Sequence, residues 1–364
     1  MLRAVRTATA TLIAATLGGA AAFAGDLTDS LKAGTPEVKS AGALAFGPDG
    51  VLFAADQAGG ALFAIDTGDR GRSQSQSPGQ ADVEGIDAKV AGMLGTTPDQ
   101  ILIRDMAVNP ASGNVYLSVA RGRGPDAPGV IVRVDAKGEI QELPLKDVKF
   151  AKAELPGLAS GRGRQDSITD LAYVDGRVFI AGLSNEEFSS NLRAVPFPFT
   201  GAGGQGTQVE IYHGAHGRFE TTSPVRTFVA YEIAGKPYIL AAYTCTPLVK
   251  FAVSDLQPGA RVKGTTIAEL GNRNKPLDMI VYQKDGRDYF LMANSSRGVM
   301  KIAGDRAGSQ EGIVKRVSDK AGLTYDTIEG LKGVEQLDKL DRDNAVVLAR
   351  GEGGRLDLKA VALP

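Results

Sequence analysis

Apolar and polar residues alternate along much of this chain, in short runs that come in pairs. The first pair is Ala43–Phe46 and Val51–Ala55, and the turn sequence Gly47-Pro48-Asp49-Gly50 lies between the two runs. A period of two residues places side chains on the two faces of an extended strand, and aspartate and glycine favour a tight reversal of the chain. The pattern therefore predicts a β-hairpin.

This hairpin pattern recurs along the whole chain. The copies begin near residues 43, 105, 170, 227, 278 and 335, about 58 residues apart. A third alternating run follows each pair, at 61–66, 130–135, 191–197, 248–253, 298–303 and 355–361. Antiparallel units of three or four strands at this spacing are typical of propeller blades. We predict an all-β fold, with a single six-bladed β-propeller domain over residues 25–364.

The ends of the repeat region predict how the ring closes. The sixth copy stops after its third strand, and residues 36–40 precede the first copy. We expect this N-terminal segment to be the missing outer strand of the last blade, which would leave no open edge. Helical spacing of apolar residues predicts short helical insertions at Ile86–Leu94 and Leu323–Leu331.

The first copy carries a family resemblance. Its sequence from Phe46 to Asp56, Phe-Gly-Pro-Asp-Gly-Val-Leu-Phe-Ala-Ala-Asp, resembles the repeat core of NHL-type and gluconolactonase/regucalcin-like six-bladed propellers. The resemblance implies the same fold. Regucalcin-like lactonases use a Glu, Asn and Asp metal set with an Asn-Gly beside it, and no matching Asn-Gly occurs here. Propellers host enzymes, binding modules and scaffolds alike, so the resemblance indicates architecture more than function.

Composition narrows the function classes. The 46 glycines among 364 residues fit a fold with many turns. The chain has 41 basic and 42 acidic residues, so no excess charge suggests nucleic acid as a partner. One cysteine excludes an internal disulfide and a cysteine-rich zinc site. Motifs for covalent haem, a Walker A loop, a GxSxG nucleophile and HExxH are missing from the sequence.

The first residues predict export. Arg3 and Arg6 precede an apolar, alanine-rich stretch that ends near Ala22, and Ala22-Phe23-Ala24 fits a signal-peptidase site. We therefore expect a signal peptide at residues 1–24 and a periplasmic or secreted mature protein. After cleavage no stretch of the sequence is apolar and long enough for a transmembrane segment.

Carboxylates recur at one position of the repeat. Asp105, Asp170 and Asp278 lie just before the innermost strand of their copies, and Glu335 lies near that position in the sixth. We expect them to converge at one mouth of the central channel. A hard, oxygen-rich site of this kind suits Ca²⁺. The alternative is that each carboxylate caps a turn by accepting hydrogen bonds from nearby backbone N–H groups.

A second candidate site contains softer ligands. His213 and His216 are the only histidines, and Cys245 is the only cysteine. The blade assignment places all three on one face, in adjacent blades. Two imidazoles and a thiolate suit copper or zinc. The alternative is a cysteine that packs as a small buried hydrophobe, near histidines of a glycine-rich loop.

Basic and amide side chains form a third set, in loops of the same class: Arg121, Asn185, Asn294 and Arg297. Arginines could clamp a carboxylate or phosphate by paired hydrogen bonds, or the set is ordinary solvated surface. Taken together, the sequence favours a binding propeller that recognises a small molecule, a metal ion or a periplasmic protein. Two alternatives remain open: a metal-dependent enzyme, either a lactonase-like hydrolase or a copper oxidoreductase, and a scaffold of a periplasmic complex.

Overall fold

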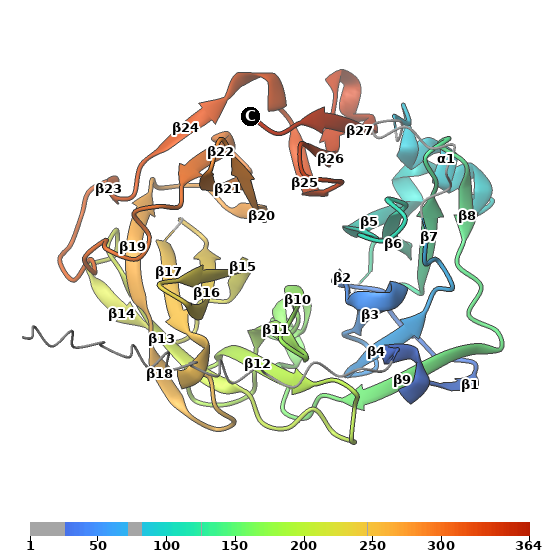
Figure 1. Cartoon of the computed structure of the whole chain (residues 1–364), viewed down its shortest axis with the longest axis horizontal. Helices are drawn as coiled ribbons and strands as arrows, with labels where there is room; N and C mark the ends of the chain where they lie inside the picture. Colours follow the sequence, from blue (N-terminus) through green and yellow to red (C-terminus); the bar gives the residue numbers. More distant parts are fainter. Residues whose placement is uncertain (1–25, 72–81, 125, 246) are drawn as a thin grey trace, which may run out of the picture.

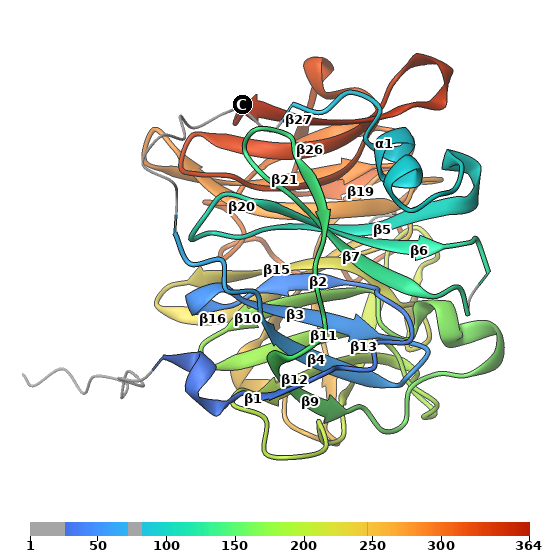
Figure 2. The same ribbon diagram turned by 90° about the vertical axis from the view of Figure 1, so that its right-hand side faces the viewer.

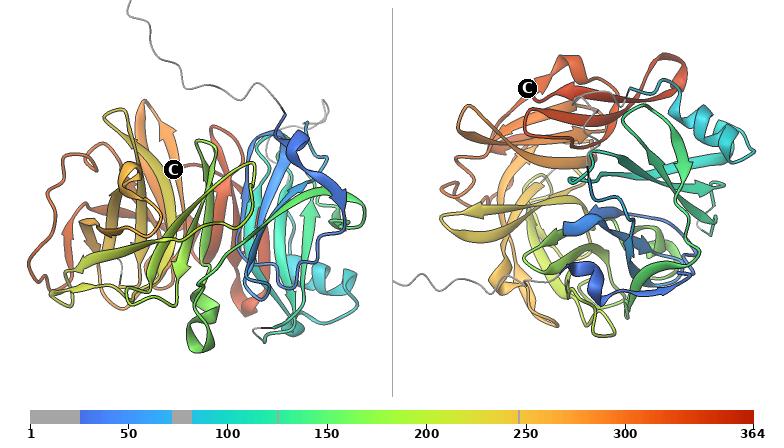
Figure 3. Two further views of the ribbon diagram at one scale, coloured as in Figure 1. Left: turned by 90° about the horizontal axis from the view of Figure 1, so that it is seen from below. Right: turned by 45° about the vertical axis from the view of Figure 1, so that its right-hand side comes forward.

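Six β-sheets surround a central channel (Figure 1). The computed structural model describes residues 26–71, 82–124, 126–245 and 247–364, so the predicted signal peptide at 1–24 lies outside the described residues. The sheets stand side by side, each with its innermost strand on the channel (Figure 3). The prediction of a six-bladed β-propeller is confirmed.

We number the blades by the first appearance of their innermost strand along the chain, and give their strands from the channel outwards. Blade 1 contains β2 (Leu44–Phe46), β3 (Val51–Asp56), β4 (Ala61–Asp66), β9 (Val148–Glu154) and β1 (Lys32–Gly34). Blade 2 contains β5 (Ile101–Val108), β6 (Val115–Arg121), β7 (Gly129–Val134) and β8 (Ile140–Glu142). Blade 3 contains β10 (Asp170–Val174), β11 (Arg177–Leu183), β12 (Ser190–Pro196), β13 (Thr207–His213) and β14 (Arg218–Glu220), and β18 (Arg261–Lys263) also pairs with β13.

The other three blades follow the same plan. Blade 4 contains β15 (Val225–Ile233), β16 (Lys236–Tyr243), β17 (Pro247–Ala252), β19 (Thr265–Leu270) and β23 (Lys320–Gly322). Blade 5 contains β20 (Pro276–Lys284), β21 (Arg287–Asn294), β22 (Gly298–Ala303) and β24 (Tyr325–Ile328). Blade 6 contains β25 (Val334–Lys339), β26 (Asn344–Arg350) and β27 (Leu356–Ala362).

The hairpin turns have the backbone that the sequence predicts. Asp175 and Gly176 have φ angles of 47° and 73°, and Asp285 and Gly286 have 52° and 74°. Two consecutive residues with positive φ match the right-handed twist of the flanking strands, and aspartate followed by glycine tolerates this conformation best. These turns fix the register of the inner two strands in blades 3 and 5.

The blades do not follow one another around the ring in chain order. Innermost strand β2 neighbours both β5 and β10, and β5 also neighbours β25. Around the ring the order is therefore blade 1, 3, 4, 5, 6, 2. Six hydrophobic clusters show the same order, because each joins one adjacent pair of blades. Blades 1 and 2 have exchanged places relative to a ring built in chain order.

A crossing strand makes this exchange possible. After blade 2 the chain returns to blade 1, where β9 pairs with β4. The N-terminal strand β1 then pairs with the outer edge of β9, with Ala33 opposite Lys149. The expected closure of the last blade by the N-terminal segment is therefore wrong. The backbone N–H groups of Lys39 and Ser40 instead donate to the carboxylate of Asp56, in blade 1.

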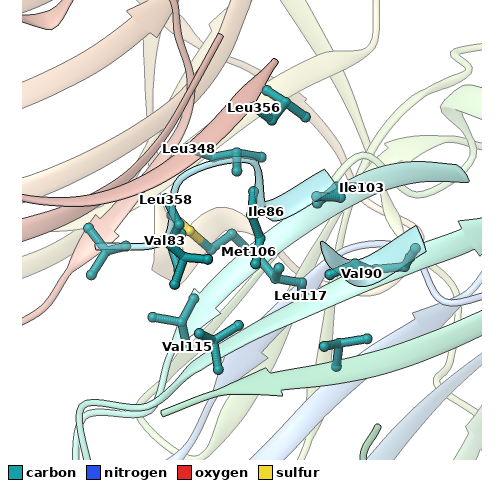
Figure 4. Close-up of a cluster of buried hydrophobic side chains, with 14 of the residues drawn as sticks. Val83, Ile86, Val90, Ile103, Met106, Val115, Leu117, Leu348, Leu356 and Leu358 are labelled. Atoms are coloured by element: carbon teal, nitrogen blue, oxygen red, sulfur yellow. The ribbon is translucent and has the colours of Figure 1, made fainter. Parts of the chain in front are cut away.

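Residues that follow blade 1 cover the last blade instead. Val83 forms an isolated bridge with Leu358 of β27. The helix α1 (Ile86–Met93) follows, and it lies at the rim of the ring beside β27 and β5 (Figure 2). Its buried residues Ile86 and Val90 join a cluster with Leu356 and other residues of blades 2 and 6 (Figure 4). The predicted helix at 86–94 is confirmed, and it helps to close the ring.

The second predicted helix, at Leu323–Leu331, is wrong. Residues 325–328 form β24, which pairs with β22 as the outer strand of blade 5, and Glu329–Leu331 is one 3-10 turn. Tyr325, Thr327 and Ile328 are β-branched or aromatic and fit a half-buried strand better than a helix. Further 3-10 turns lie at Leu27–Ser30, Pro48–Gly50, Pro98–Gln100, Gly161–Asp166, Val253–Asp255 and Glu352–Gly354. Within the described residues no helix has the length and apolar character to cross a membrane.

Candidate functional site

Four carboxylates line one cavity on the channel axis, of about 410 Å³. Three are Asp105, Asp170 and Asp278, which come from blades 2, 3 and 5. The fourth is Asp338 of blade 6, where the sequence suggested Glu335. Each of the four residues is largely buried, and only a minor part of it is exposed to the channel.

Each of these aspartates binds the next blade around the ring. Asp105 accepts a hydrogen bond from the N–H of Leu44, Asp170 from Phe228, Asp278 from Leu337 and Asp338 from Val108, at 2.7–2.8 Å. In Asp170, Asp278 and Asp338 the second oxygen accepts from the N–H of the following residue. All four links point the same way around the ring. This geometry matches the capping alternative and explains the carboxylates without a bound cation.

Glu335 is displaced by an irregularity in β25. The pairing of β25 with β26 shifts register between Val334 and Gln336, so Gln336 takes the repeat position of Asp105 and Asp278. Glu335 then lies at the mouth of the channel, where it forms an ion pair with Arg350 at 2.6 Å. Asp338 lies two residues beyond Gln336, on the same side of the strand. Glu335 lies one residue before the repeat position, so the alternation of β25 points to Gln336 and Asp338 as the residues on the channel side.

Burial and mutual repulsion act together on these carboxyl groups. Burial raises the pKa of Asp170 to about 7 and that of Asp338 to about 6, and backbone hydrogen bonds oppose the shift. Burial, followed by the charge of neighbouring aspartates, raises the pKa of Asp105 and of Asp278 well above the usual range. Like charges in a confined space favour the neutral form.

A wider cavity forms the mouth of the channel, of about 1030 Å³. Asn294 lines it, but its side-chain amide donates to Asn274 and its oxygen accepts from the N–H groups of Ser296 and Arg297. The other predicted polar residues do not line this cavity. The guanidinium of Arg121 donates to the carbonyl of Leu94, and that of Arg297 donates to the carbonyl of Asn272.

Asn185 also lies away from the mouth cavity. It is in the loop after β11, where its N–H donates to the carbonyl of Gly157. The mouth contains other basic groups, which the sequence analysis did not single out: Arg104, Arg226, Lys275 and Lys332. Arg104 and Arg226 each lie one residue before the repeat position of the channel aspartates. This shared position in the repeat is the sequence feature that could have identified them as residues of the mouth.

The two histidines and the cysteine converge on the same face as the mouth. One nitrogen of His213, one nitrogen of His216 and the sulfur of Cys245 lie within 4.8 Å of one another. The imidazole rings of His213 and His216 are 3.8 Å apart between centroids. His213 ends β13 of blade 3, and Cys245 follows β16 of blade 4. This spacing is slightly wider than that of ligands on one ion, and small rotations of His216 and Cys245, which are partly exposed, would close it.

A carboxylate orients both imidazoles. The oxygens of Glu220 accept from His213 Nδ1 at 3.0 Å and from His216 Nδ1 at 2.6 Å, and Ser223 also donates to it. An ionised carboxylate only accepts hydrogen bonds, so both Nδ1 atoms carry the proton. Each Nε2 then keeps its lone pair. His213 Nε2 is buried and has no hydrogen-bond partner within the described part of the chain.

The charges at this cluster fit a neutral His213 ring beside an ionised carboxylate. Burial alone would raise the pKa of Glu220, but hydrogen bonds from His213, His216 and Ser223 lower it to about 2. Burial lowers the pKa of His213, and Glu220 only partly offsets this effect. The two shifts agree when His213 donates to Glu220 as a neutral ring. Neutral imidazole is the form that binds metal ions.

A second buried carboxylate shapes the turn between the histidines. Glu269 of β19 accepts from the N–H of Gly214 at 2.5 Å, and the N–H of Gly217 donates to the carbonyl of His213. Burial raises the pKa of Glu269 to about 7, and the N–H groups of Gly214 and Ala215 oppose that shift. Neither Glu220 nor Glu269 was singled out from the sequence, because β14 and β19 lie far from the repeat positions that carry the other candidates.

Two hydrogen bonds connect the cysteine loop to the mouth. The N–H of Cys245 donates to the carbonyl of Asn274, the residue before Lys275. Thr244 Oγ1 accepts from Arg226 Nε at 3.3 Å. Both Lys275 and Arg226 line the mouth, so the cluster and the mouth cavity share one wall.

Comparisons with known proteins add nothing on function. No family model and no curated protein matches the sequence. Solved structures with similar folds include domains 1–2 of Drosophila semaphorin 1b (12% identity, 92% of this chain, 87% of that chain, TM-score 0.41). A putative oxidoreductase (glucose dehydrogenase) from Thermus thermophilus has 12% identity over 91% of this chain and 100% of that chain, with a TM-score of 0.36. PQQ-bound aldose sugar dehydrogenase from Streptomyces coelicolor has 10% identity over 91% and 97%, with a TM-score of 0.32. Likeness at these values carries no argument about activity.

Proposed function

We propose that this protein is an exported metal-binding β-propeller in which His213, His216 and Cys245 hold one copper or zinc ion. The observation that carries the proposal is the role of Glu220, which accepts from both Nδ1 atoms and leaves both Nε2 lone pairs free. His213 Nε2 is buried without a hydrogen-bond partner, and a buried nitrogen in that state destabilises the folded protein. Histidine ligands commonly donate their other N–H to a carboxylate in this way.

The donor set supports copper or zinc over calcium. Imidazole and thiolate are soft ligands that suit copper and zinc, whereas calcium takes hard oxygen ligands. Three protein ligands also leave one coordination position open, as in catalytic metal sites. The His216 side chain is 46% exposed, so a bound ion would be accessible from solvent. Among the enzyme alternatives this arrangement favours a copper oxidoreductase.

A lactonase-like hydrolase has less support. The resemblance of the first copy to gluconolactonase/regucalcin-like propellers would imply a hard cation among the channel carboxylates. Asp170, Asp278 and Asp338 instead use both oxygens to accept hydrogen bonds from backbone N–H groups.

The proposal that the protein is exported rests on residues 1–24 alone. N-terminal sequencing of the protein secreted by a bacterial host should find Gly25 as the first residue.

Element analysis of the purified protein tests the metal. The mature chain, purified without a metal-affinity tag, is expected to retain or rebind about one copper or zinc ion per chain. Cys245→Ser and His216→Ala should lose it, while the matched control Asp170→Asn should keep it. Both lost ligands are partly exposed, so these variants are expected to fold, which thermal unfolding would verify.

Either of two metal results, or the absence of any bound ion, would overturn the proposal. One is copper or zinc that stays bound in Cys245→Ser, because the site would then lie elsewhere. The other is calcium at one ion per chain that is lost in Asp170→Asn, because the channel carboxylates would then be the metal site. A protein that takes up neither kind of ion would support the scaffold alternative.

A further inference from the structure

The mouth of the channel has an excess of positive charge. Five cationic and two anionic side chains line its cavity of about 1030 Å³. The cations are Arg104, Arg226, Lys275, Lys332 and Arg350. This volume is ample for a small molecule, and the walls come from the first residues of inner strands and from the loops before them and after the second strands. The chain as a whole is nearly neutral, so the excess is local to the mouth.

Three of these cations already have carboxylate partners. Arg226 binds Asp166 at 2.6 Å, Arg350 binds Glu335 at 2.6 Å, and Lys332 binds Glu329 at 2.9 Å. Within each pair the two charges neutralise each other, so the excess positive charge of the mouth comes from the remaining two cations. The pairs also hold Arg226 and Arg350 in place on the wall.

Arg104 and Lys275 have no such partner. Neither forms an ion pair with any residue in the described part of the chain. Arg104 Nε is buried without a hydrogen bond, and its terminal nitrogen makes one long contact of 3.4 Å to the carbonyl of Gly124. Partial burial, and next the charge of Arg226, lower the pKa of Lys275. Lys275 is exposed and Arg104 is partly buried, and two unpaired cations that line one cavity are stabilised by an anion between them.

The two cations stand on either side of blade 6. Arg104 belongs to blade 2 and Lys275 immediately precedes blade 5, and both blades adjoin blade 6 in the ring. A ligand with two separated carboxylates matches this placement better than a compact anion. Amide and hydroxyl groups of Gln336 and Ser295 lie on the same wall and can bind polar parts of a ligand. The channel aspartates lie one layer deeper and do not line the mouth cavity.

We propose that the mouth binds a small dicarboxylate, with Arg104 and Lys275 as the groups that pair with its two carboxylates. This site is distinct from the metal site and goes beyond the proposed function. The two sites share the wall formed by Thr244, Arg226 and Asn274. A dicarboxylate bound at the mouth would therefore lie next to the metal cluster.

The test uses succinate and its uncharged analogue succinamide. Both are titrated into the mature protein by calorimetry, on the Cys245→Ser background so that metal plays no part. Succinate is expected to bind at about one per chain, and succinamide at least about tenfold more weakly. Arg104→Gln and Lys275→Gln should each weaken succinate binding about tenfold. The control Lys137→Gln removes an exposed charge from the β7–β8 turn and should leave it unchanged.

Several outcomes would overturn the proposal. They are no succinate binding at millimolar concentration, equal binding of succinamide, and affinity that is unaltered in the Arg104→Gln/Lys275→Gln double variant. Binding of inorganic phosphate without binding of succinate would also overturn it, because the ligand class would be wrong. Succinate that binds wild-type protein but not Cys245→Ser would be a ligand of the metal instead. The titrations on the Cys245→Ser background require no bound metal, so they test the dicarboxylate site even if the metal proposal fails.

Discussion

The carboxylate of Asp338 accepts a hydrogen bond from the backbone N–H of Val108 at 2.7 Å, across 230 residues of sequence. It joins the last blade of the chain to blade 2, which is its neighbour in the ring only because blades 1 and 2 have exchanged places. Asp105 forms the corresponding link from blade 2 to Leu44 of blade 1. The aspartates at the channel therefore follow the spatial order of the blades rather than the order of the chain.

Removing the Asp338 link should destabilise the ring. Asp338→Ala leaves the buried N–H of Val108 without a partner, and we expect a loss of about 1–3 kcal/mol in the free energy of unfolding. Urea unfolding at pH 5 measures it, because the charge repulsion that the substitution also removes is small there. The control Asp343→Ala, in an exposed turn, should change stability by less than about 0.5 kcal/mol. Equal effects would mean that the link contributes nothing.

The exchanged blade order predicts which residues can be cross-linked. Ala33 of β1 lies opposite Lys149 of β9, a spacing compatible with a disulfide. On a Cys245→Ser background, Ala33→Cys/Lys149→Cys should form a disulfide, seen by gel mobility without reductant. Ala33→Cys/Lys359→Cys tests the rejected closure on β27 and should stay reduced. The opposite result would restore a ring closed by the N-terminal strand.

Much of the fold follows from short-range patterns. Alternation, together with turns rich in glycine, aspartate or asparagine, locates the inner three strands of every blade, because those strands pair with their neighbours in sequence. The outer strands were not predictable in this way. Strand β9 pairs with β4 across the whole of blade 2, and β1 pairs with β9. No local pattern specifies a pairing over such a distance, so the blade order could not be read from the repeat.

The candidate site also contains residues that the sequence pattern predicts and one that it does not. The convergence of His213, His216 and Cys245 followed from counting strands, because the end of a fourth strand and the turn after a second strand lie on one face. Counting strands could not identify Glu220, because β14 is a short extra strand at the edge of blade 3. Its role depends on the turn from His213 to Gly217, which reverses the chain so that Glu220 faces both rings.

Glu220 should control metal affinity without being a ligand. Glu220→Gln keeps the size of the side chain but removes the charge that fixes both Nδ1 protons. We expect copper or zinc affinity to fall about 10–100-fold, measured by competition with a chromophoric chelator. Arg218→Gln is the matched control, because Arg218 is exposed and makes only a 3.4 Å contact to Glu220. An unchanged affinity in Glu220→Gln would show that the carboxylate has no orienting role.

The turn between the histidines should tolerate no side chain at Gly214. A Cβ atom there would lie 2.9 Å from Glu269 Oε1 and 2.9 Å from Val317 Cγ2, closer than packed atoms approach. Gly214→Ala should displace the turn, lower stability by about 1–3 kcal/mol and weaken metal binding. Gly330→Ala is a suitable control, since no atom lies within 4 Å of its added Cβ. Metal affinity that survives in Gly214→Ala would indicate that the turn adapts freely.

The channel carboxylates should make stability depend on pH. Their folded pKa values are raised, to about 7 for Asp170 and about 6 for Asp338, against about 3.9 in an unfolded chain. A group with a raised folded pKa stabilises the protein fully below its unfolded pKa, and this contribution is lost as pH rises through the folded value. The four aspartates should therefore lower the free energy of unfolding between about pH 4 and pH 7.

The double variant Asp105→Asn/Asp278→Asn isolates this effect. It removes two of the four charges, so its stability relative to the wild type should increase steadily as pH rises from 4.5 to 8. Glu220 and Asp357, whose pKa values are lowered to about 2, act in the opposite direction but are present in both chains and cancel in the difference. Urea midpoints across this pH range give the comparison. Parallel profiles would mean that the carboxylates ionise without mutual repulsion, as they would around a bound cation, and would revive the calcium site that their hydrogen bonds argue against.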